Sequence, residues 1–290
     1  MNCSLCGSTK VFKVYQVRDF FFSGEEFGLM ECEECRVRFT HPVPSKEELF
    51  KYYKSDEYLS HANKQKTFLA FLYDFIRGIN VKWKANQISR YCPNTGAILD
   101  VGCGAGVFLS EMKKRGWMCT GVEPDTNSLS YVEDKLQINV VGDILEIEKN
   151  KQFDVISLWH VLEHFYDPKM VLNELNTLLK NDGLLVIAVP NYESLDSRYF
   201  GSYWAAYDVP RHLYHFSPDV LRSLLESCGF TTLEIKPLAV DVLYITYLSN
   251  RYLKKWPALL KGVLRGLYFL LRSRRVSDYS SIVFFARKNC

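Results

Sequence analysis

The chain has 290 residues, of which 48% are hydrophobic and 24% charged, a composition typical of a folded globular protein rather than of a disordered tail. Its 36 basic residues nearly balance its 33 acidic ones, so bulk charge excludes a histone-like nucleic-acid binder. We find no secretory signal and no run of about 18 uncharged apolar residues, which predicts a cytoplasmic protein. In that compartment the nine cysteines are expected as free or metal-bound thiols.

The pattern along the chain predicts three units: a small zinc ribbon (1–44), a helical lead segment (45–95) and an α/β domain (96–290). Strands are expected at 11–17, 27–31, 97–101, 117–122, 153–158, 184–189, 230–236 and 281–287, with a further short one that ends near 142. Helices are expected at 66–79, 106–115, 126–136, 168–180 and 217–227. This alternation predicts a Rossmann-like, seven-stranded, mostly parallel sheet with helices on both faces.

Two cysteine pairs with matched spacing lie in the first unit. Cys3 and Cys6 form one pair, Cys32 and Cys35 the other, and 25 residues separate the pairs. Two residues between paired thiols let both sulfurs reach one tetrahedral ion, so the four cysteines predict a structural Zn²⁺ site. A unit of about 40 residues has too small a core to fold alone, and the metal would supply much of its stability. A redox pair or buried free thiols are the alternatives.

A glycine-rich turn follows the strand at 97–101. Gly102, Gly104 and Gly106, with Cys103 between the first two, open a helix whose N-terminal N–H groups face a ligand. The third glycine falls one residue too early for a dinucleotide-binding motif. Asp100 would repel a pyrophosphate and attract an ammonium group, which favours a cofactor with an α-amino acid end.

Acids also end the next two strands. Glu123, followed by Pro124, is placed to accept hydrogen bonds from two ribose hydroxyls. Asp143 is placed to accept from an exocyclic amine, and Ile144 to pack on a purine face. Partners for an ammonium, a ribose and an adenine at three strand ends together predict S-adenosylmethionine.

Residues 95–290 resemble class I S-adenosylmethionine-dependent methyltransferases. The resemblance is carried by the glycine loop, the acid after the second strand, and the segments 153–156 and 178–185. More closely, the chain is similar to bacterial small-molecule methyltransferases with an N-terminal zinc ribbon, through motifs at 32–42, 161–164 and 208–216. That resemblance implies methyl transfer to an oxygen or carbon atom of a small molecule, such as a sugar or a lipid- or carrier-linked glycan.

Three histidines lie beside the expected cofactor site. Methyl transfer to such an acceptor needs a base, and histidine suits this at neutral pH. His212 is the first candidate, His164 the second and His160 the third, while Trp159 is expected to pack on the adenosine. Residues 160–164 also match an inverted zinc-peptidase signature, but their position after a parallel strand argues against that interpretation.

The connection at 191–216 is too long for a simple loop and is expected to cover the acceptor. Tyr203, Trp204 and Tyr207 would stack on a ring or sugar face. Arg211 would hold a phosphate or carboxylate, with His215 beside it. An internally packed aromatic loop is the alternative. The resemblance further implies that Tyr53 and Tyr58 close the cofactor end of the pocket.

Several partners can be weighed from the sequence. The tetrad typical of DNA amino-methyltransferases does not follow the strand at 153–158, so no DNA partner is expected. An RNA methyltransferase that binds RNA through the ribbon is one alternative, but acids outnumber bases there. A non-catalytic cofactor-binding scaffold is another.

The segment 242–277 contains eight basic residues and no acid. Its helical, strongly apolar stretch at 256–272 predicts either peripheral contact with a membrane or a helical pair packed on the domain or at a dimer seam.

Overall fold

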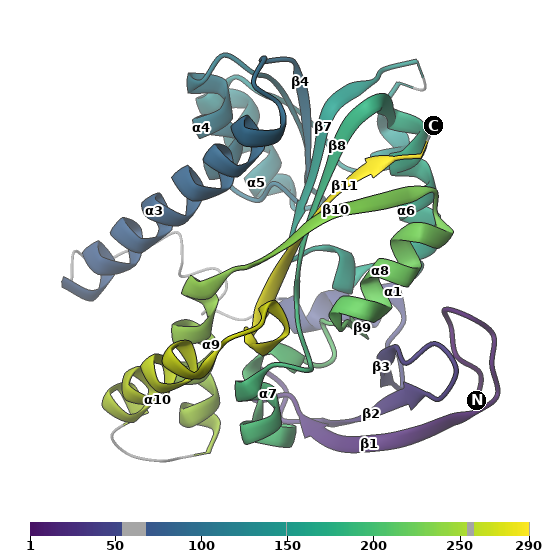
Figure 1. The fold of residues 1–290 in the computed structure, drawn as a ribbon, viewed down its shortest axis with the longest axis vertical. Helices are drawn as coiled ribbons and strands as arrows, with labels where there is room; N and C mark the ends of the chain where they lie inside the picture. Colours follow the sequence, from purple (N-terminus) through teal and green to yellow (C-terminus); the bar gives the residue numbers. More distant parts are fainter. Residues whose placement is uncertain (54–67, 149, 254–257, 290) are drawn as a thin grey trace.

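A computed structural model describes residues 1–53, 68–148, 150–253 and 258–289 (Figure 1). Its large sheet has seven strands in the order β10-β11-β8-β7-β4-β5-β6. The strands from β8 to β6 run parallel, and β11 is antiparallel to both of its neighbours. In the sheet order, the bounds are Phe230–Pro237, Ser281–Lys288, Leu179–Pro190, Phe153–Trp159, Ala97–Val101, Met118–Val122 and Asn139–Val141. The predicted seven-stranded, mostly parallel sheet is confirmed.

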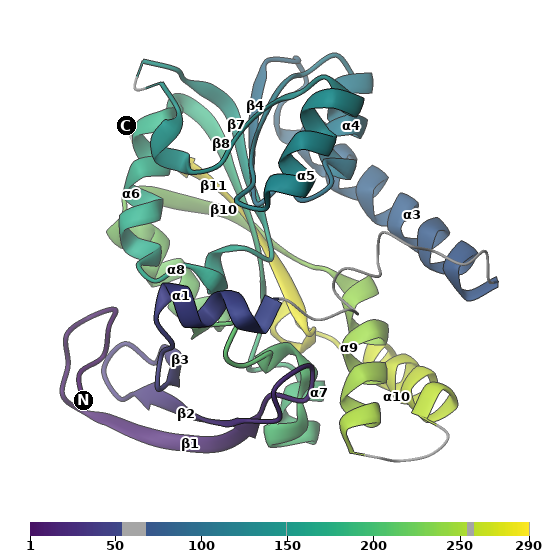
Figure 2. The same ribbon diagram turned by 180° about the vertical axis from the view of Figure 1, so that it is seen from behind.

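Helices cover both faces of this sheet (Figures 1 and 2). Successive strand residues point to opposite layers: Ile98 and Val155 pack in one apolar cluster, Leu99 and Ile156 in another. Because these strands are buried on both faces, their sequences are continuous apolar runs, and this pattern allowed the strands to be predicted. The first layer contains α3 (Phe68–Tyr91), α4 (Val107–Lys114) and α5 (Thr126–Tyr131); the second contains α6 (Pro168–Leu178) and α8 (Pro218–Ser227).

Local signals set several helix ends. Ser217 caps α8 by accepting a hydrogen bond from the N–H of Val220, and Pro218 occupies the first helical position. The predicted helix at 126–136 continues from α5 as a π-helical turn over Val132–Leu136. The predicted helix at 168–180 ends earlier, because Leu179 already pairs with Phe153 and begins β8.

The N-terminal unit forms a second sheet in the order β1-β2-β3-β9 (Figure 1). The first three strands are Val11–Arg18, Glu26–Cys32 and Arg38–His41, and all pairings in the sheet are antiparallel. β9 (Tyr214–His215) comes from the long connection after β8. The sequence predicted β1 and β2 but neither β3 nor β9, so the sheet crosses the predicted unit boundary at residue 44. The division into 1–44, 45–95 and 96–290 stays a prediction.

A helical hairpin follows β10. α9 (Ala239–Tyr252) packs on α10 (Ala258–Arg272), and a Cβ atom added at Gly262 would lie 2.7 Å from the Tyr247 Cα. Glycine therefore lets the two helices approach closely. Within the described residues, no helix combines the length and the apolar run needed to cross a bilayer.

Short helical turns complete the described chain. They are α1 (Lys46–Leu49), α7 (Leu195–Phe200) and 3₁₀ turns at Phe50–Tyr53, Ile144–Glu146, Leu162–His164, Gly201–Tyr203, Ala205–Tyr207 and Val276–Asp278.

Candidate active site

The glycine turn lies at the carboxyl end of β4, as predicted. Gly102, Gly104 and Gly106 all have positive φ angles, of 70°, 52° and 67°. A Cβ atom on Gly102 would collide with Val161, whereas one on Gly104 would meet nothing within 4 Å. The middle glycine therefore presents bare backbone to open space, where a ligand can approach.

Two carboxylates flank this turn. Asp100 is buried, and its Oδ1 accepts a hydrogen bond from the Ser157 hydroxyl at 2.6 Å. Burial raises the pKa of Asp100 to about 7, against the opposing effects of Ser157 and Lys84. At the end of β5, Glu123 accepts from the Gly104 N–H at 2.8 Å, and burial raises its pKa too. The side chain thus reaches the turn and keeps lone pairs for a ligand.

A lysine that the sequence analysis missed lies over the same site. The Lys84 Nζ, from α3, lies 4.3 Å from the centre of the Trp159 ring. Burial lowers the pKa of Lys84, while the charges of Asp241 and Asp100 favour its ammonium form. Nothing in the spacing of α3 distinguishes this lysine, because its partners are distant in the sequence.

The third predicted acid is more open. Asp143 is exposed and accepts from the Leu145 N–H at 2.9 Å, and Ile144 is buried against the core. Pro124 is exposed beside Glu123. These residues follow β6 and β5, so the structure brings them to the same edge of the sheet as Asp100. Cys103, within the turn, has its side chain buried in the apolar core.

Two acids hold His160, which follows β7. Its Nε2 lies 2.9 Å from an Asp241 oxygen and its Nδ1 3.5 Å from a Glu163 oxygen. Burial by itself would lower the pKa of His160, but these carboxylates outweigh it and raise the pKa to about 9. At neutral pH the ring is therefore an imidazolium. In this form it can act as a fixed positive charge, but it has no lone pair with which to act as a base.

His164 and His212 meet next to the buried Glu163. Their ring centres are 4.7 Å apart, and one ligand atom from each of the three residues lies within 4.8 Å of the others. The Nδ1 of His164 is 3.0 Å from the Arg211 carbonyl, and the Nδ1 of His212 is 2.9 Å from the Ala206 carbonyl. A carbonyl only accepts, so both Nδ1 atoms carry the proton and both Nε2 atoms keep a lone pair.

The two rings differ in their surroundings. Burial and the neighbouring His212 lower the pKa of His164 to about 4. The Nε2 of His212 lies 4.0 Å from an Asp208 oxygen, a carboxylate that would stabilise a proton there. His212 thus combines a free Nε2 lone pair with a carboxylate beside it, which makes it the candidate base.

Arg211 and His215 point into the protein. The guanidinium of Arg211 contacts Asp208 at 2.6 Å and Asp19 at 3.0 Å, and 2% of the residue is exposed. The Nε2 of His215 lies 3.1 Å from the Thr40 hydroxyl, and burial holds its pKa well below the usual value. Both side chains are thus engaged with the N-terminal unit.

The aromatic residues of the long connection separate into two groups. Trp204 and Tyr207 are buried; the Trp204 indole donates to Asp196 at 2.7 Å, and the Tyr207 hydroxyl accepts from Arg38 at 3.2 Å. This is the packing that the alternative interpretation expected. Tyr203 is 40% exposed and lies near Phe20.

Tyr53, in the lead segment, lies beside the histidines. The Tyr53 hydroxyl lies 3.1 Å from the His164 Nδ1. Tyr58 lies outside the described residues.

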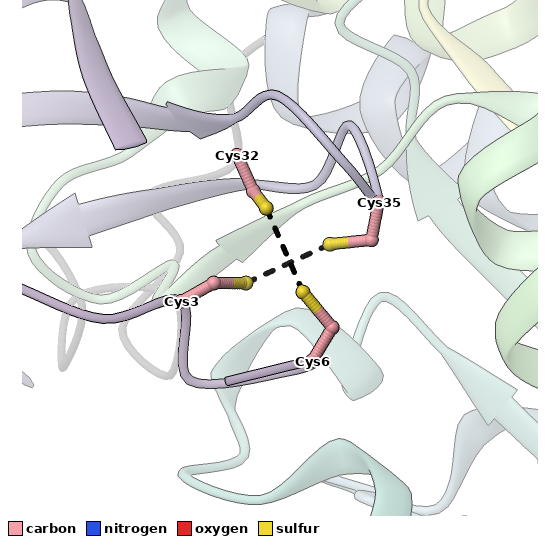
Figure 3. A group of neighbouring side chains, drawn as sticks. All are labelled: Cys3, Cys6, Cys32 and Cys35. Carbon is pink, nitrogen blue, oxygen red and sulfur yellow. Dashed lines mark hydrogen bonds between the residues drawn. The ribbon is translucent and has the colours of Figure 1, made fainter. Parts of the chain in front are cut away.

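The four cysteines of the N-terminal unit converge as predicted (Figure 3). The sulfurs of Cys3 and Cys35 are 3.6 Å apart, as are those of Cys6 and Cys32, and all four lie within 4.8 Å of one another. Tetrahedral zinc with bonds of about 2.3 Å requires sulfurs about 3.8 Å apart, so the donor set fits this metal. Arg36 follows Cys35 with a φ of 61° and completes the second turn despite its side chain.

A family model described as a methyltransferase domain matches residues 75–235. The chain belongs to this family. The predicted class I S-adenosylmethionine-dependent methyltransferase is therefore confirmed, and the matched region contains the glycine turn, both flanking carboxylates and the histidines.

Curated relatives of this methyltransferase include ubiquinone biosynthesis O-methyltransferases. The protein of that name from Rhodopseudomonas palustris (strain BisB5) is 24% identical over 174 residues, which cover 56% of this chain and 69% of the relative. The one from Glaesserella parasuis is 31% identical over 106 residues, 32% of this chain and 45% of the relative. The chain thus spans about half to two thirds of the length of these curated relatives.

Solved structures show the same fold. The 1,6-didemethyltoxoflavin-N1-methyltransferase of Burkholderia thailandensis, with S-adenosylhomocysteine bound, is 14% identical; the match has a TM-score of 0.55 and covers 94% of this chain and all of that one. The magnesium protoporphyrin IX methyltransferase of Synechocystis PCC 6803 is 13% identical, with a TM-score of 0.54 and coverage of 86% and 99%.

Proposed function

We propose that this methyltransferase transfers the methyl group of S-adenosylmethionine to an oxygen or carbon atom of a small molecule. The observation that carries the proposal is the pair of carboxylates, the buried Asp100 and the half-buried Glu123, on either side of the open backbone at Gly104. The names of the curated relatives support an oxygen acceptor on a small molecule. A sugar or a carrier-linked glycan is the acceptor class that the sequence resemblance favours.

Each part of the cofactor has a proposed partner. Asp100 binds its ammonium group and Glu123 its ribose hydroxyls. Asp143 accepts from the adenine amine, Ile144 packs on the adenine, and Trp159 lines the adenosine. We add Lys84, whose ammonium lies near Asp100 and would pair with the cofactor's carboxylate. The bound cofactor supplies an electrophilic methyl group, so the protein has to orient the acceptor and remove its proton.

His212 is the proposed base. The His212 Nδ1 donates to the Ala206 carbonyl, which leaves the Nε2 lone pair to take the acceptor's proton. Asp208 lies 4.0 Å from that Nε2 and stabilises the imidazolium that forms. His164 contributes a neutral ring at neutral pH and His160 a fixed positive charge. Of the predicted acceptor contacts, Tyr203 is the most accessible.

Calorimetry tests the cofactor site. We expect S-adenosylmethionine to bind the parent protein, with at least about a tenfold loss of affinity in Asp100→Ala and Glu123→Ala, because each variant removes a charge-assisted contact. Glu193→Ala serves as the control, because that residue lies outside the cofactor site. Equal affinity in all four proteins would refute the assignment. Acceptors are then screened with a labelled methyl donor, and His212→Asn should abolish turnover.

We also propose that Cys3, Cys6, Cys32 and Cys35 hold a structural Zn²⁺. Their four sulfur atoms lie within 4.8 Å of one another, close enough for a single tetrahedral ion to bind all four. Elemental analysis should give one zinc per chain, and Cys32→Ser should lower that content while Cys92→Ser leaves it unchanged. A metal-free parent protein of full stability would refute the site.

Finally, we propose that α10 meets an anionic membrane surface. Its exposed apolar residues recur at helical spacing and form a stripe of Leu260, Val263, Leu264, Leu267, Tyr268 and Leu271. Basic residues accompany the stripe, and 242–277 contains no acid, so the surface complements anionic lipid. Such a location would suit a lipid-linked acceptor.

Co-sedimentation with phosphatidylglycerol-containing vesicles tests this contact. We expect binding that the double variant Leu264→Ser, Leu267→Ser abolishes, because it removes two exposed members of the stripe. Phe269 is unsuitable as a target, because it is buried against the rest of the protein. Leu145→Ser, an exposed apolar residue elsewhere, is the control. No binding by the parent, or elution as a stable dimer without vesicle binding, would refute the proposal.

A further inference from the structure

The N-terminal ribbon contacts the chain directly at the proposed base. β9 pairs with β3 through Arg38 opposite His215 and Phe39 opposite Tyr214. The N–H of Thr40 donates to the Leu213 carbonyl at 3.0 Å. The edge of the ribbon thus binds the backbone at the three positions that follow His212.

The side chain of Thr40 adds two contacts. Thr40 is fully buried, and its hydroxyl lies 2.6 Å from the His212 carbonyl and 3.1 Å from the His215 Nε2. A carbonyl only accepts, so the Thr40 hydroxyl donates its single proton to the hydrogen bond with the His212 backbone carbonyl. The hydroxyl oxygen then accepts from His215, which requires the proton of that neutral ring to be on Nε2. One threonine therefore fixes the backbone of His212 and the tautomer of His215.

A second contact holds the other side of His212. Asp19, in the turn after β1, accepts from the N–H groups of Phe21 and Ser23 and binds the Arg211 guanidinium at 3.0 Å. Arg211 also binds Asp208, whose carboxylate faces the His212 Nε2. The ribbon therefore positions both the backbone of the base and the carboxylate beside it.

The carboxylates of the proposed cofactor site have partners outside the ribbon. Asp100 is bonded to Ser157, and Glu123 to Gly104 and Asp125. Among the described residues, these hydrogen-bond donors to the two carboxylates all belong to the α/β domain itself. A change in the ribbon should therefore reach the base while it leaves the cofactor site intact.

We propose that the ribbon is an intramolecular brace for the catalytic segment, with Thr40 as a positioning residue that orients His212 and sets the tautomer of His215. The inference rests on the proposed function for the role of His212, although the positioning itself can be observed without a known acceptor.

The test uses the full chain with ¹⁵N-labelled histidine and long-range ¹H–¹⁵N spectra recorded from pH 5 to 9. His212→Asn and His215→Asn assign the two rings. In the parent we expect an Nδ1–H tautomer for His212 and an Nε2–H tautomer for His215. In Thr40→Val the His215 tautomer should become mixed and the ¹⁵N chemical shifts of the His212 ring should change. Thr40→Ser should restore both signals, and Thr9→Val, at an exposed ribbon threonine, should change neither.

Binding of S-adenosylhomocysteine distinguishes a failure of the brace from a failure of the proposed function. We expect the same Kd in the parent and in Thr40→Val within about twofold, since the brace does not reach the cofactor site. His212 and His215 signals in Thr40→Val that superimpose on those of the parent would overturn the brace, as would equal changes in Thr40→Ser. A parent protein that fails to bind S-adenosylhomocysteine would refute the proposed function, while the brace is still decided by the histidine spectra.

Discussion

The buried carboxyl group of Asp100 makes cofactor binding depend on pH. Burial raises its pKa to about 7, whereas the cofactor's ammonium group needs a carboxylate as its partner. Below pH 7 the protein must first lose a proton from Asp100, and the apparent Kd rises as the ionised fraction falls. Binding of the cofactor should therefore weaken as the pH falls.

The size of the effect follows from that pKa. About half of the molecules have an ionised Asp100 at pH 7, about a tenth at pH 6 and about a hundredth at pH 5. The apparent Kd should therefore rise about fivefold between pH 7 and pH 6 and about ninefold more by pH 5. The cofactor's own amino group, with a pKa near 8, stays charged throughout this range. Nearby, His160, whose pKa is about 9, also stays charged.

Isothermal titration calorimetry with S-adenosylmethionine at pH 5, 6 and 7 measures this dependence. At pH 7, binding should release about half a proton, which appears as a dependence of the enthalpy on the buffer. Asp100→Asn should bind more weakly and lose most of the pH dependence. A flat Kd in the parent, or the same slope in Asp100→Asn, would show that another group controls the titration and would refute this reasoning.

Three further predictions concern other parts of the structure. Lys84→Met should weaken S-adenosylhomocysteine about tenfold but leave adenosine, which lacks the carboxylate, unaffected in calorimetry. Arg211→Met should lower the free energy of unfolding by about 3–5 kcal/mol in urea titrations, because it removes the cation that pairs with the buried Asp19 and the half-buried Asp208, whereas Arg222→Met, at an exposed ion pair, should change it by less than about 0.5 kcal/mol. Phe269→Ala, which empties a buried site on α10, should cost about 3–5 kcal/mol, and Leu271→Ala, at a position 85% exposed, should cost almost nothing; equal losses would show that α10 faces the other way.

Features with a local cause were predictable from the sequence. Parallel strands are buried on both faces and read as apolar runs, and the turn at Gly102–Gly106 needs positive φ angles that glycine provides. The paired cysteines have the spacing that one ion imposes. In each case the signal lies within a few residues.

Features that depend on distant partners were not predictable. β9 has two residues and no strand pattern, because its pairing depends on an edge of the ribbon far away in the chain. His160 looked like a base, but Asp241, 81 positions later, makes it a cation. Trp204 is of a residue type that often stacks on ligands, but in this structure it is buried and its indole N–H donates to Asp196. The sequence could not show this contact.

The shared sheet also constrains how the protein is made. β3 leaves the ribosome about 170 residues before β9, its partner. At synthesis rates of about 5–20 residues per second, this edge stays open for roughly 9–34 s. An unpaired strand edge can pair with strands of other chains, so a chaperone that covers this edge would protect the nascent chain during this interval.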